Sequence, residues 1–449
     1  MKRVLVANRG EIAVRVVRAC RALGLESVVA VSDADRDSLA ARLADRAVCI
    51  GPAKPTASYL NRDALLATAL GTGADAVHPG YGFLAENAEF ARACEEEGLT
   101  FVGPSSASIR AMGNKLAARE AAQRSGVPLV PGSGHIRAYE DAHEIAEEIG
   151  YPVLFKAASG GGGRGIRIVH AEPELEAAFR GASAEAAAAF GDPTLYLERY
   201  VTTGRHIEVQ VIGDSTGRVL HLGERDCSLQ RRYQKVLEEA PAAAVPVHAR
   251  EAIRSSAVLL AEAIGYLNAG TVEFLYDEER DEHYFLEMNT RIQVEHPVTE
   301  MITGLDLVQL QLQVAAGEPL PMTQDEVTFS GHAIECRINA EAPEQGFAPS
   351  PGRITRWAPP EGPGVRLDTH CYEGYVVPPF YDSLLGKLVV HGRDREEALA
   401  RTRTALRDFT VEGVATTISF HRWLLDQPDV VAGRFSTRWL ESRLHAFTG

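Results

Sequence analysis

Short apolar runs alternate with stretches of helical periodicity over residues 1–113. The apolar runs, each predicted to form a strand, lie at residues 4–7, 27–31, 47–50, 76–78 and 101–102. The helical patterns lie between them, at residues 12–23, 39–43, 64–70 and 90–94. Strands that alternate with helices are typical of parallel βαβ units. The pattern therefore predicts an α/β domain built on a doubly wound parallel sheet.

The pattern changes over residues 114–203. It predicts a helix at 114–126, strands at 152–157 and 166–169, an Ala/Glu-rich helix at 173–190 and a strand at 195–198. A glycine-rich loop, residues 159–165, separates the first two strands. This order of elements predicts a compact α+β insert.

From residue 204 onward the strands are expected to be antiparallel. They are predicted at residues 206–212, 219–222, 271–276, 283–288 and 332–339. Proline-rich stretches within 343–363 predict surface loops, and residues 395–410 predict an amphipathic helix. We divide the chain into four segments, residues 1–113, 114–203, 204–330 and 331–449.

Composition narrows the class of protein. The 449 residues are 45% hydrophobic, which is ordinary for a chain that builds a large core. The net charge is −15, from 46 Lys and Arg against 61 Asp and Glu, and it disfavours binding to nucleic acid or anionic lipid. A phosphate-bearing ligand therefore needs a local basic cluster.

The sequence also argues against export and membrane insertion. The first apolar run stops at Ala7, which is too short for a signal peptide, and no stretch of about 18 apolar residues occurs. The six cysteines include no C-x-x-C pair, which argues against a disulfide framework or a zinc knuckle. We expect a cytoplasmic protein.

The glycine-rich loop formally satisfies a dinucleotide fingerprint at Gly160, Gly162 and Gly165. We reject that interpretation because a strand, not a helix, is predicted to follow. No Lys-Ser or Lys-Thr closes the loop, so it is not a Walker A loop either. A glycine loop between strands can instead be a phosphate-binding flap or a mobile surface hairpin.

Two lysines are candidates to accompany such a flap. Lys156 lies in an apolar strand three residues before the loop, where it could reach nucleotide phosphates. Lys115 is the second candidate, although a solvated helix lysine would look the same.

Residues 286–297 form the most informative stretch of the chain. If this stretch is extended, period-two geometry places five polar side chains on one face: Glu287, Asn289, Arg291, Gln293 and Glu295. A strand facing solvent could show the same pattern. Surface strands, however, favour Thr and Lys over a mixed-charge row that ends in His-Pro.

The polar row suggests specific chemistry. Glu273, in another apolar strand, completes with Glu287 and Asn289 an oxygen-rich set suited to Mg²⁺ against ATP phosphates. Arg291 offers a planar fork for a small oxyanion, which leaves Glu295 as a base.

Residues 224–241 reverse the overall charge locally, with four basic residues between positions 225 and 235. This segment is either a solvated loop or the cationic wall of an anion site. Acidic residues flank it, which disfavours nucleic acid as the ligand.

Five segments together resemble the biotin carboxylase family of the ATP-grasp superfamily, over essentially the whole chain. The motifs lie at residues 7–13, 78–87, 159–165, 224–241 and 287–301. The resemblance implies an N-terminal biotin carboxylase domain (1–113), a helical linker and mobile lid (114–203), an ATP-grasp catalytic part (204–330) and a biotin carboxylase C-terminal domain (331–449). ATP would bind between the lid and the C-terminal part.

The resemblance also implies roles for individual residues. Nucleotide contacts fall on Lys115, Lys156, Gly162, Gly163, His206, Gln230 and Tyr233, and the segment beside adenine on Glu198, Arg199, Tyr200 and Val201. The bicarbonate site falls on Lys235, Arg291, Gln293 and Val294, with Glu295 as general base and Arg337 beside biotin. Metal ligands for two Mg²⁺ or Mn²⁺ ions fall on Glu273, Glu287 and Asn289. Tyr233 is a departure, because the family usually has histidine there.

The implied activity is ATP-dependent carboxylation of biotin with bicarbonate, through carboxyphosphate. This is the first half-reaction of an acyl-CoA carboxylase, for example the acetyl-CoA carboxylase of fatty acid biosynthesis. The sequence lacks the Ala-Met-Lys-Met motif that carries biotin, so we expect a separate biotin carboxyl carrier protein. A carboxyltransferase subunit and a homodimer are also expected.

Two other functions stay open from the sequence. One is a different ATP-grasp carboxylase or ligase that uses carboxyphosphate on an amine such as urea. The other is a non-catalytic ATP-binding subunit, which the complete set of candidate residues disfavours.

Overall fold

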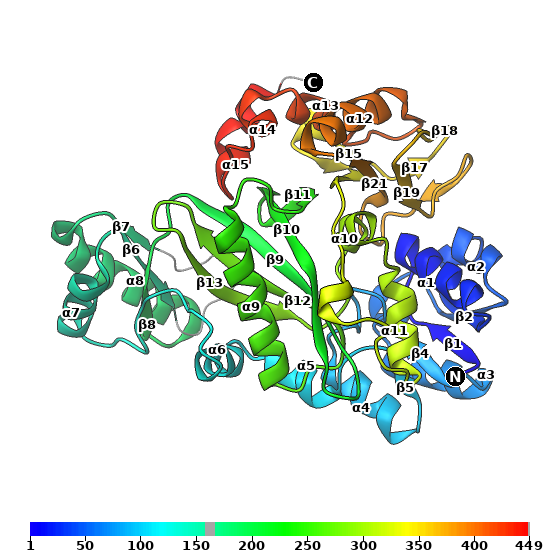
Figure 1. Cartoon of the computed structure of the whole chain (residues 1–449), viewed down its shortest axis with the longest axis horizontal. Helices are drawn as coiled ribbons and strands as arrows, with labels where there is room; N and C mark the ends of the chain where they lie inside the picture. Colours follow the sequence, from blue (N-terminus) through cyan, green and yellow to red (C-terminus); the bar gives the residue numbers. More distant parts are fainter. Residues whose placement is uncertain (158–166, 448–449) are drawn as a thin grey trace.

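The computed structural model describes residues 1–157 and 167–447 (Figure 1). The whole predicted glycine-rich flap, residues 159–165 with Gly162 and Gly163, lies outside the described residues. The remaining candidate residues are all described.

The N-terminal segment forms a five-stranded parallel sheet in the order β3-β2-β1-β4-β5, as the alternating pattern predicted. Its strands are β1 (Arg3–Val6), β2 (Glu26–Ser32), β3 (Arg46–Gly51), β4 (Ala76–His78) and β5 (Thr100–Phe101). Its helices are α1 (Gly10–Ala22), α2 (Leu39–Leu43), α3 (Arg62–Thr72), α4 (Ala88–Glu96) and α5 (Ser106–Gly113). Buried aliphatic side chains such as Val6 and Val29 fill the space between sheet and helices.

The second segment projects to one side of the molecule (Figure 1). After α6 (Lys115–Arg124) and α7 (Tyr139–Ile149), β6 (Val153–Ala157), β7 (Arg167–Val169) and β8 (Leu195–Arg199) form an antiparallel sheet in the order β7-β6-β8. α8 (Leu175–Phe190) covers this sheet and starts two residues later than predicted, because Glu172–Glu174 form a 3₁₀ turn. Phe155 and Phe179 pack edge to face in its separate core.

The centre of the molecule is an eight-stranded sheet in the order β13-β12-β9-β10-β11-β14-β21-β19. Its strands are β9 (Gly204–Gly213), β10 (Val219–Arg231), β11 (Gln234–Ala240), β12 (Asn268–Asp277), β13 (Glu282–Asn289), β14 (His332–Asn339), β19 (Val365–Thr369) and β21 (Leu384–Gly392). All neighbours are antiparallel. Because β11 pairs with β14, one sheet runs across the division expected at residues 330 and 331.

The helices of this part pack against the sheet and connect it to the N-terminal segment. They are α9 (Val247–Ala263), α10 (His296–Thr303), α11 (Leu307–Ala315) and, beyond the sheet, α12 (Arg395–Asp408), α13 (Ile418–Leu425), α14 (Pro428–Val431) and α15 (Trp439–Arg443). Within the described ranges, none is long and apolar enough to span a bilayer.

The proline-rich segment is less irregular than predicted. It contains the two-stranded pair β15 (Glu341–Ala342) and β16 (Ala348–Pro349), together with β17 (Gly352–Arg353) and β18 (Arg356–Ala358). The last two pair with β20 (Val376–Val377) and β22 (Thr410–Glu412). Its loops are therefore anchored to the C-terminal part by short backbone ladders.

The basic segment at residues 224–241 is a hairpin, not a solvated loop. β10 continues to Arg231, well past the predicted end at Leu222, because its polar side chains are buried and paired. Arg232 and Tyr233 form the two-residue turn into β11, with φ of 48° and 64°. Two successive positive φ values are typical of a type I′ hairpin turn, which suits the twist of the strands.

Candidate active site

A cleft of about 2330 Å³ opens between the four segments of the chain. Its walls carry every described candidate residue, namely Lys115, Lys156, Glu198, Arg199, Tyr200, Val201, His206, Gln230, Tyr233, Lys235, Glu273, Glu287, Asn289, Arg291, Gln293, Val294, Glu295 and Arg337. Residues separated by more than 200 positions in the sequence thus share one cavity.

The stretch at residues 287–295 is not one extended strand, so the predicted polar face is wrong in its geometry. β13 ends at Asn289, and Glu295 precedes α10, whose first turn contains Pro297. The polar side chains converge for another reason: the amide groups of Asn289 and Gln293 both donate to Oε1 of Glu273, each at 3.0 Å. The chain after β13 turns around the carboxylate of Glu273. This turn, rather than the alternating geometry of a strand, brings the polar side chains together.

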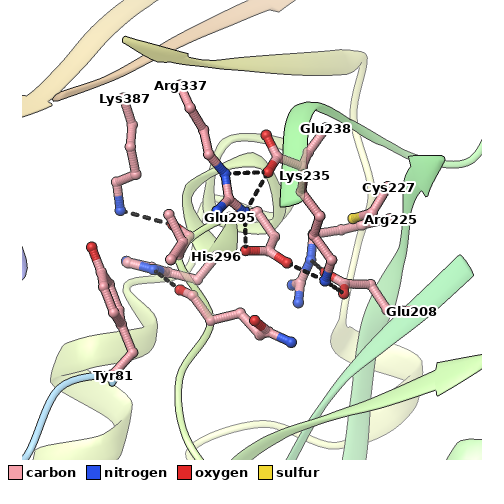
Figure 2. Close-up of polar contacts among 12 residues, drawn as sticks. Tyr81, Glu208, Arg225, Cys227, Lys235, Glu238, Glu295, His296, Arg337 and Lys387 are labelled. Carbon is pink, nitrogen blue, oxygen red and sulfur yellow. Dashed lines mark hydrogen bonds and ion pairs between the residues drawn. The ribbon is translucent and has the colours of Figure 1, made fainter. Parts of the chain in front are cut away.

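Glu295 lies at the centre of the charged network and is fully buried (Figure 2). Its Oε1 accepts from Nζ of Lys235 at 2.6 Å, and its Oε2 accepts from Nη2 of Arg337 at 2.9 Å. Burial alone would raise the pKa of Glu295, but the charges of Lys235, Arg337 and Arg225 hold that pKa well below its usual range. The carboxylate is therefore ionised at neutral pH.

Lys235 connects three carboxylates. Besides Glu295, its Nζ contacts Oε2 of Glu208 at 2.5 Å and Oε1 of Glu273 at 3.1 Å. Burial alone would lower the pKa of Lys235, but these carboxylates raise it well above its usual value. Arg225 completes the pattern by donating to Glu208 at 2.5 Å. Cations and anions alternate through the network, which is how buried charges are tolerated.

Arg291 is oriented from the N-terminal segment. Its Nε donates to Glu86 at 2.9 Å, Nη2 donates to Oδ1 of Asn289 at 3.0 Å, and Nη1 donates to Oε1 of Gln293 at 3.2 Å. Glu86 lies in the 78–87 motif, so this contact joins two of the segments that carry the family resemblance. The guanidinium is partly exposed to the cleft and fits a small anion.

Glu273 and Glu287 are directly opposite each other on β12 and β13. Partial burial and the neighbouring Glu273 both raise the pKa of Glu287. Like charges at paired positions destabilise a sheet unless a cation lies between them. Two carboxylates with the amide oxygen of Asn289 nearby match the oxygen ligands that Mg²⁺ prefers, so these residues fit the expected metal.

The candidate nucleotide residues line the other end of the cleft. Nζ of Lys156 contacts Glu198 at 2.5 Å, and Lys115 is exposed at the start of α6. The guanidinium of Arg438, at the end of the chain, lies 4.4 Å from the ring centroid of Tyr200. The side chain of Arg199 donates to the carbonyl oxygen of Ile149, so it connects β8 to the end of α7.

Tyr233 lies at the tip of the β10–β11 hairpin, with 82% of its surface exposed. Nearby, Nε2 of Gln230 lies 2.9 Å from Nδ1 of His206, whose Nε2 lies 3.0 Å from Glu273. A chain of contacts therefore runs from the nucleotide-side candidates to the metal-site candidates.

Three family models match consecutive parts of the chain. Residues 1–109 match the family model "Biotin carboxylase, N-terminal domain", residues 114–323 match "Carbamoyl-phosphate synthase L chain, ATP binding domain", and residues 335–442 match "Biotin carboxylase C-terminal domain". Biotin carboxylase 1 of Bacillus subtilis (strain 168) is 53% identical over 443 residues, which cover 98% of each chain. The chain belongs to the biotin carboxylase family.

Solved biotin carboxylase structures share its fold. The biotin carboxylase domain of a thermophilic 2-oxoglutarate carboxylase, bound to bicarbonate, superposes with a TM-score of 0.94 at 48% identity and covers 99% of this chain and 98% of its own. The corresponding domain dimer from Hydrogenobacter thermophilus, in complex with MgADP, ADP and bicarbonate, has a TM-score of 0.88 at 50% identity, with coverage of 99% and 98%.

Sequence reasoning missed several members of the network in this biotin carboxylase family member. Glu208 and Arg225 are fully buried beside Lys235, and Glu238 contacts Arg337. Glu208 could have been found, because strict alternation along β9 places it on the same face as His206. Glu238 could not, because its side of the sheet depends on a local irregularity of the hairpin.

A second missed group lies on the N-terminal side of Glu295. Nζ of Lys387 donates to the carbonyl oxygen of Val294 at 2.8 Å and lies 3.0 Å from Oε1 of Glu11. Tyr81 donates to the same Glu11 carboxylate. These buried contacts fix the turn before Glu295 against α1.

Proposed function

We propose that the protein is a biotin carboxylase that uses ATP and bicarbonate to carboxylate biotin carried by a separate carrier protein. The observation that carries this proposal is the buried carboxylate of Glu295, held between Lys235 and Arg337 inside a cleft shared by all four segments. Membership of the biotin carboxylase family supports the same activity.

In the first step, Lys235 and Arg291 hold bicarbonate while Glu295 takes its proton. An oxygen of the resulting carbonate then attacks the γ-phosphorus of ATP, a P–O bond forms, the bond to ADP breaks, and carboxyphosphate results. Mg²⁺ bound at Glu273, Glu287 and Asn289 would supply charge neutralisation to the phosphates. The protein's task is otherwise positioning and electrostatic stabilisation.

The depressed pKa of Glu295 makes it a weak base in the free protein. Bicarbonate competes for Lys235, and biotin competes for Arg337, so substrate binding removes charge from the carboxylate. Both changes raise the pKa of Glu295 and strengthen it as a base when the substrates are in place.

In the second step, carboxyphosphate decomposes to CO₂ and phosphate. The phosphate takes a proton from the ureido nitrogen of biotin, and the nitrogen then attacks CO₂. Arg337 stabilises the negative charge that develops on the ureido oxygen. Residues 114–203 act as the lid that excludes water, because water would hydrolyse the intermediate.

The wider setting belongs to the same proposal. We expect a biotin carboxyl carrier protein and a carboxyltransferase subunit as partners, a homodimer, a cytoplasmic location, and two Mg²⁺ or Mn²⁺ ions per site. The dimer reported for the Hydrogenobacter thermophilus domain supports the assembly. One similar structure is a domain of a 2-oxoglutarate carboxylase. Acetyl-CoA, the acceptor used in fatty acid biosynthesis, is therefore one candidate acceptor of the carboxyl group among others.

The test is phosphate release from ATP with bicarbonate and free biotin added separately and together. We expect release to require bicarbonate and to increase with biotin. ATP hydrolysis that is indifferent to both would contradict the proposal. An affinity pulldown that identifies the biotinylated carrier would then define the acceptor.

A further inference from the structure

Two buried carboxyl groups face each other behind Arg337. Glu238 on β11 and Glu335 on β14 occupy directly opposite positions in the antiparallel register, and neither exposes any surface. Three of their four carboxyl oxygens, Oε2 of Glu238 and both of Glu335, have no hydrogen-bond partner in the part of the chain that the structure describes. Buried polar atoms are rarely left unpaired, so this pair needs an explanation.

Glu238 binds one edge of the Arg337 guanidinium. Its Oε1 accepts from Nε at 2.6 Å and lies 2.5 Å from Nη2, which also donates to Glu295 at 2.9 Å. The remaining nitrogen, Nη1, takes part in none of these contacts, and Arg337 lines the cleft. The contact with Glu238 therefore determines which edge of the guanidinium remains free to bind a ligand (Figure 2).

An irregularity of the hairpin brings Glu238 to this position. Leu229 pairs with Leu237 and Gln230 pairs with Lys235, so β11 holds one extra residue at this point. An extra residue in one strand changes which face the following side chains occupy. Lys235 and Glu238, three positions apart, consequently both contact the cluster around Glu295, whereas Leu237 packs in the core.

We propose that Glu238 is a positioning residue, which fixes Arg337 so that its free edge meets the ureido oxygen of biotin, while Glu335 lies behind it and does not hold the guanidinium. This inference rests on the proposed function. A carboxylate that orients a functional side chain is a recurring way to keep a site preorganised. An ionised Glu335 would instead repel Glu238 from across the strand pair.

The charged groups around Glu238 support this division of roles. It faces Arg337 and Glu335 from β14, Glu295 before α10, and Lys235 on its own strand. Burial outweighs Arg337 and raises the pKa of Glu238 to about 7. Burial raises the pKa of Glu335 well above its usual value, and its two unpartnered oxygens opposite Glu238 also favour the neutral form of this carboxyl.

The sign of the pH effect follows from these protonation states. Below pH of about 7, Glu238 gains a proton and loses its ionic contact with Arg337. Above that pH, the carboxylate is ionised and the guanidinium is fixed. Biotin-dependent turnover should therefore rise with pH through a limb centred near 7.

The experiment compares two equivalent substitutions on paired positions, E238Q and E335Q. We expect E238Q to lower kcat/KM for biotin by ~10–100-fold, the usual size for lost orientation of a functional group, and to remove the limb near pH 7. The KM for ATP should stay within about two-fold. E335Q replaces a neutral acid with a neutral amide and should retain both the rate and the limb.

A double substitution tests whether Glu238 acts through Arg337. In an Arg337→Ala background, E238Q should cause no further loss for biotin. Equal losses in E238Q and E335Q, or unchanged biotin kinetics in E238Q, would overturn the inference. If E238Q does not fold, E238D serves instead: a shorter carboxylate should keep the pH limb and lose part of the rate, and loss of the limb would count against the inference. A wild-type protein without biotin-dependent turnover would contradict the proposed function itself.

Discussion

Glu295 shows how one carboxylate can be both buried and ionised. It exposes no surface, yet Lys235 and Arg337 contact its two oxygens at 2.6 and 2.9 Å. Such a group is stable only as part of a network, because an unpaired buried charge costs several kcal/mol. In the mechanism that we propose, the same carboxylate accepts a proton once a substrate draws these cations away.

We predict that Glu295→Gln lowers kcat by at least ~10²-fold, the usual size for a lost general base. The KM for ATP should change little, because Glu295 contacts Lys235 and Arg337 and none of the nucleotide-side candidates that the structure describes. Steady-state phosphate release with ATP and bicarbonate varied in turn measures both. Turnover within a few-fold of wild type would place the base on another residue.

The exposed Tyr233 is the departure from the family pattern, and its hydroxyl can still make one hydrogen bond to a nucleotide. We predict that Tyr233→His changes the KM for ATP several-fold, equivalent to about 1 kcal/mol, and leaves kcat and the bicarbonate dependence unchanged. Histidine also tolerates the positive φ of 64° at this position. A large rise in kcat would instead reveal an impaired site and favour a non-catalytic role.

At the scale of elements, the β10–β11 hairpin is held in an unusual turn. Arg232 has φ of 48°, a region in which a residue with a Cβ is strained by ~1–2 kcal/mol. Its backbone N–H donates to Glu441 at 3.1 Å, so the turn is also tied to α15. The hairpin thus keeps the strand that carries Lys235 in register.

We predict opposite effects for two substitutions at this turn. Arg232→Asn should stabilise the protein by ~0.5–1 kcal/mol, because asparagine adopts positive φ readily, and Arg232→Val should destabilise it by at least that amount. Urea midpoints at constant m-value measure the difference. If both variants shifted in the same direction, the turn geometry would not control the stability of the hairpin.

Many elements with regular apolar spacing were predicted from sequence, although β21, α9 and α11 were not. The parallel sheet, the lid strands and β9, β12, β13 and β14 all fall at or near their predicted positions. β10 beyond Leu222 and all of β11 were missed, because buried charges there replace the apolar residues that mark a strand. The pairing partners that make those charges tolerable lie on other elements, so no local pattern reveals them.

Sequence motifs pointed to the candidate residues of the site, but they did not predict how the backbone arranges these residues. The candidate residues that the structure describes all line one cleft, whereas the extended polar face at 287–295 was wrong. Alternation assumes a continuous strand, whereas Asn289 ends β13 and Glu295 precedes a helix. The position of Glu238 likewise depends on one extra residue in β11, which only the register shows.

At the scale of the whole molecule, buried ion pairs tie distant parts of the chain together. Glu239 on β11 accepts from Nε of Arg395 at 2.6 Å and from Nη2 at 2.8 Å, and lies 2.9 Å from Nε2 of His332. Burial would raise the pKa of Glu239, but His332 and Arg395 lower it to about 2. The contacts fasten the start of α12 to the central sheet.

We predict that Glu239→Gln lowers the free energy of unfolding at pH 7 by ~3 kcal/mol, since it leaves Arg395 without its buried partner. Because the pKa of Glu239 is lower in the folded protein than in the unfolded chain, its ionised carboxylate stabilises the fold at pH values above the usual pKa of a glutamate. This stabilisation is lost as the pH falls toward about 2. The gap from wild type should therefore narrow between pH 5 and pH 3 in urea titrations. Glu412→Gln, which removes an ion pair between the exposed side chains of Arg356 and Glu412, is the control and should change stability by less than ~0.5 kcal/mol. A gap that stayed constant with pH would contradict the assignment.

The continuous central sheet limits how this chain can be recombined. The matched family models stop at residue 323 and resume at residue 335, although β11 and β14 share a backbone ladder across that interval. A fragment ended at residue 330 would lose β14, β21 and β19 and would leave β11 with an open, unprotected side. Exposed strand edges of this kind recruit other strands and lead to aggregation. Chimeras between relatives should therefore exchange the two halves of this sheet together, with crossover points placed in the connections to the lid.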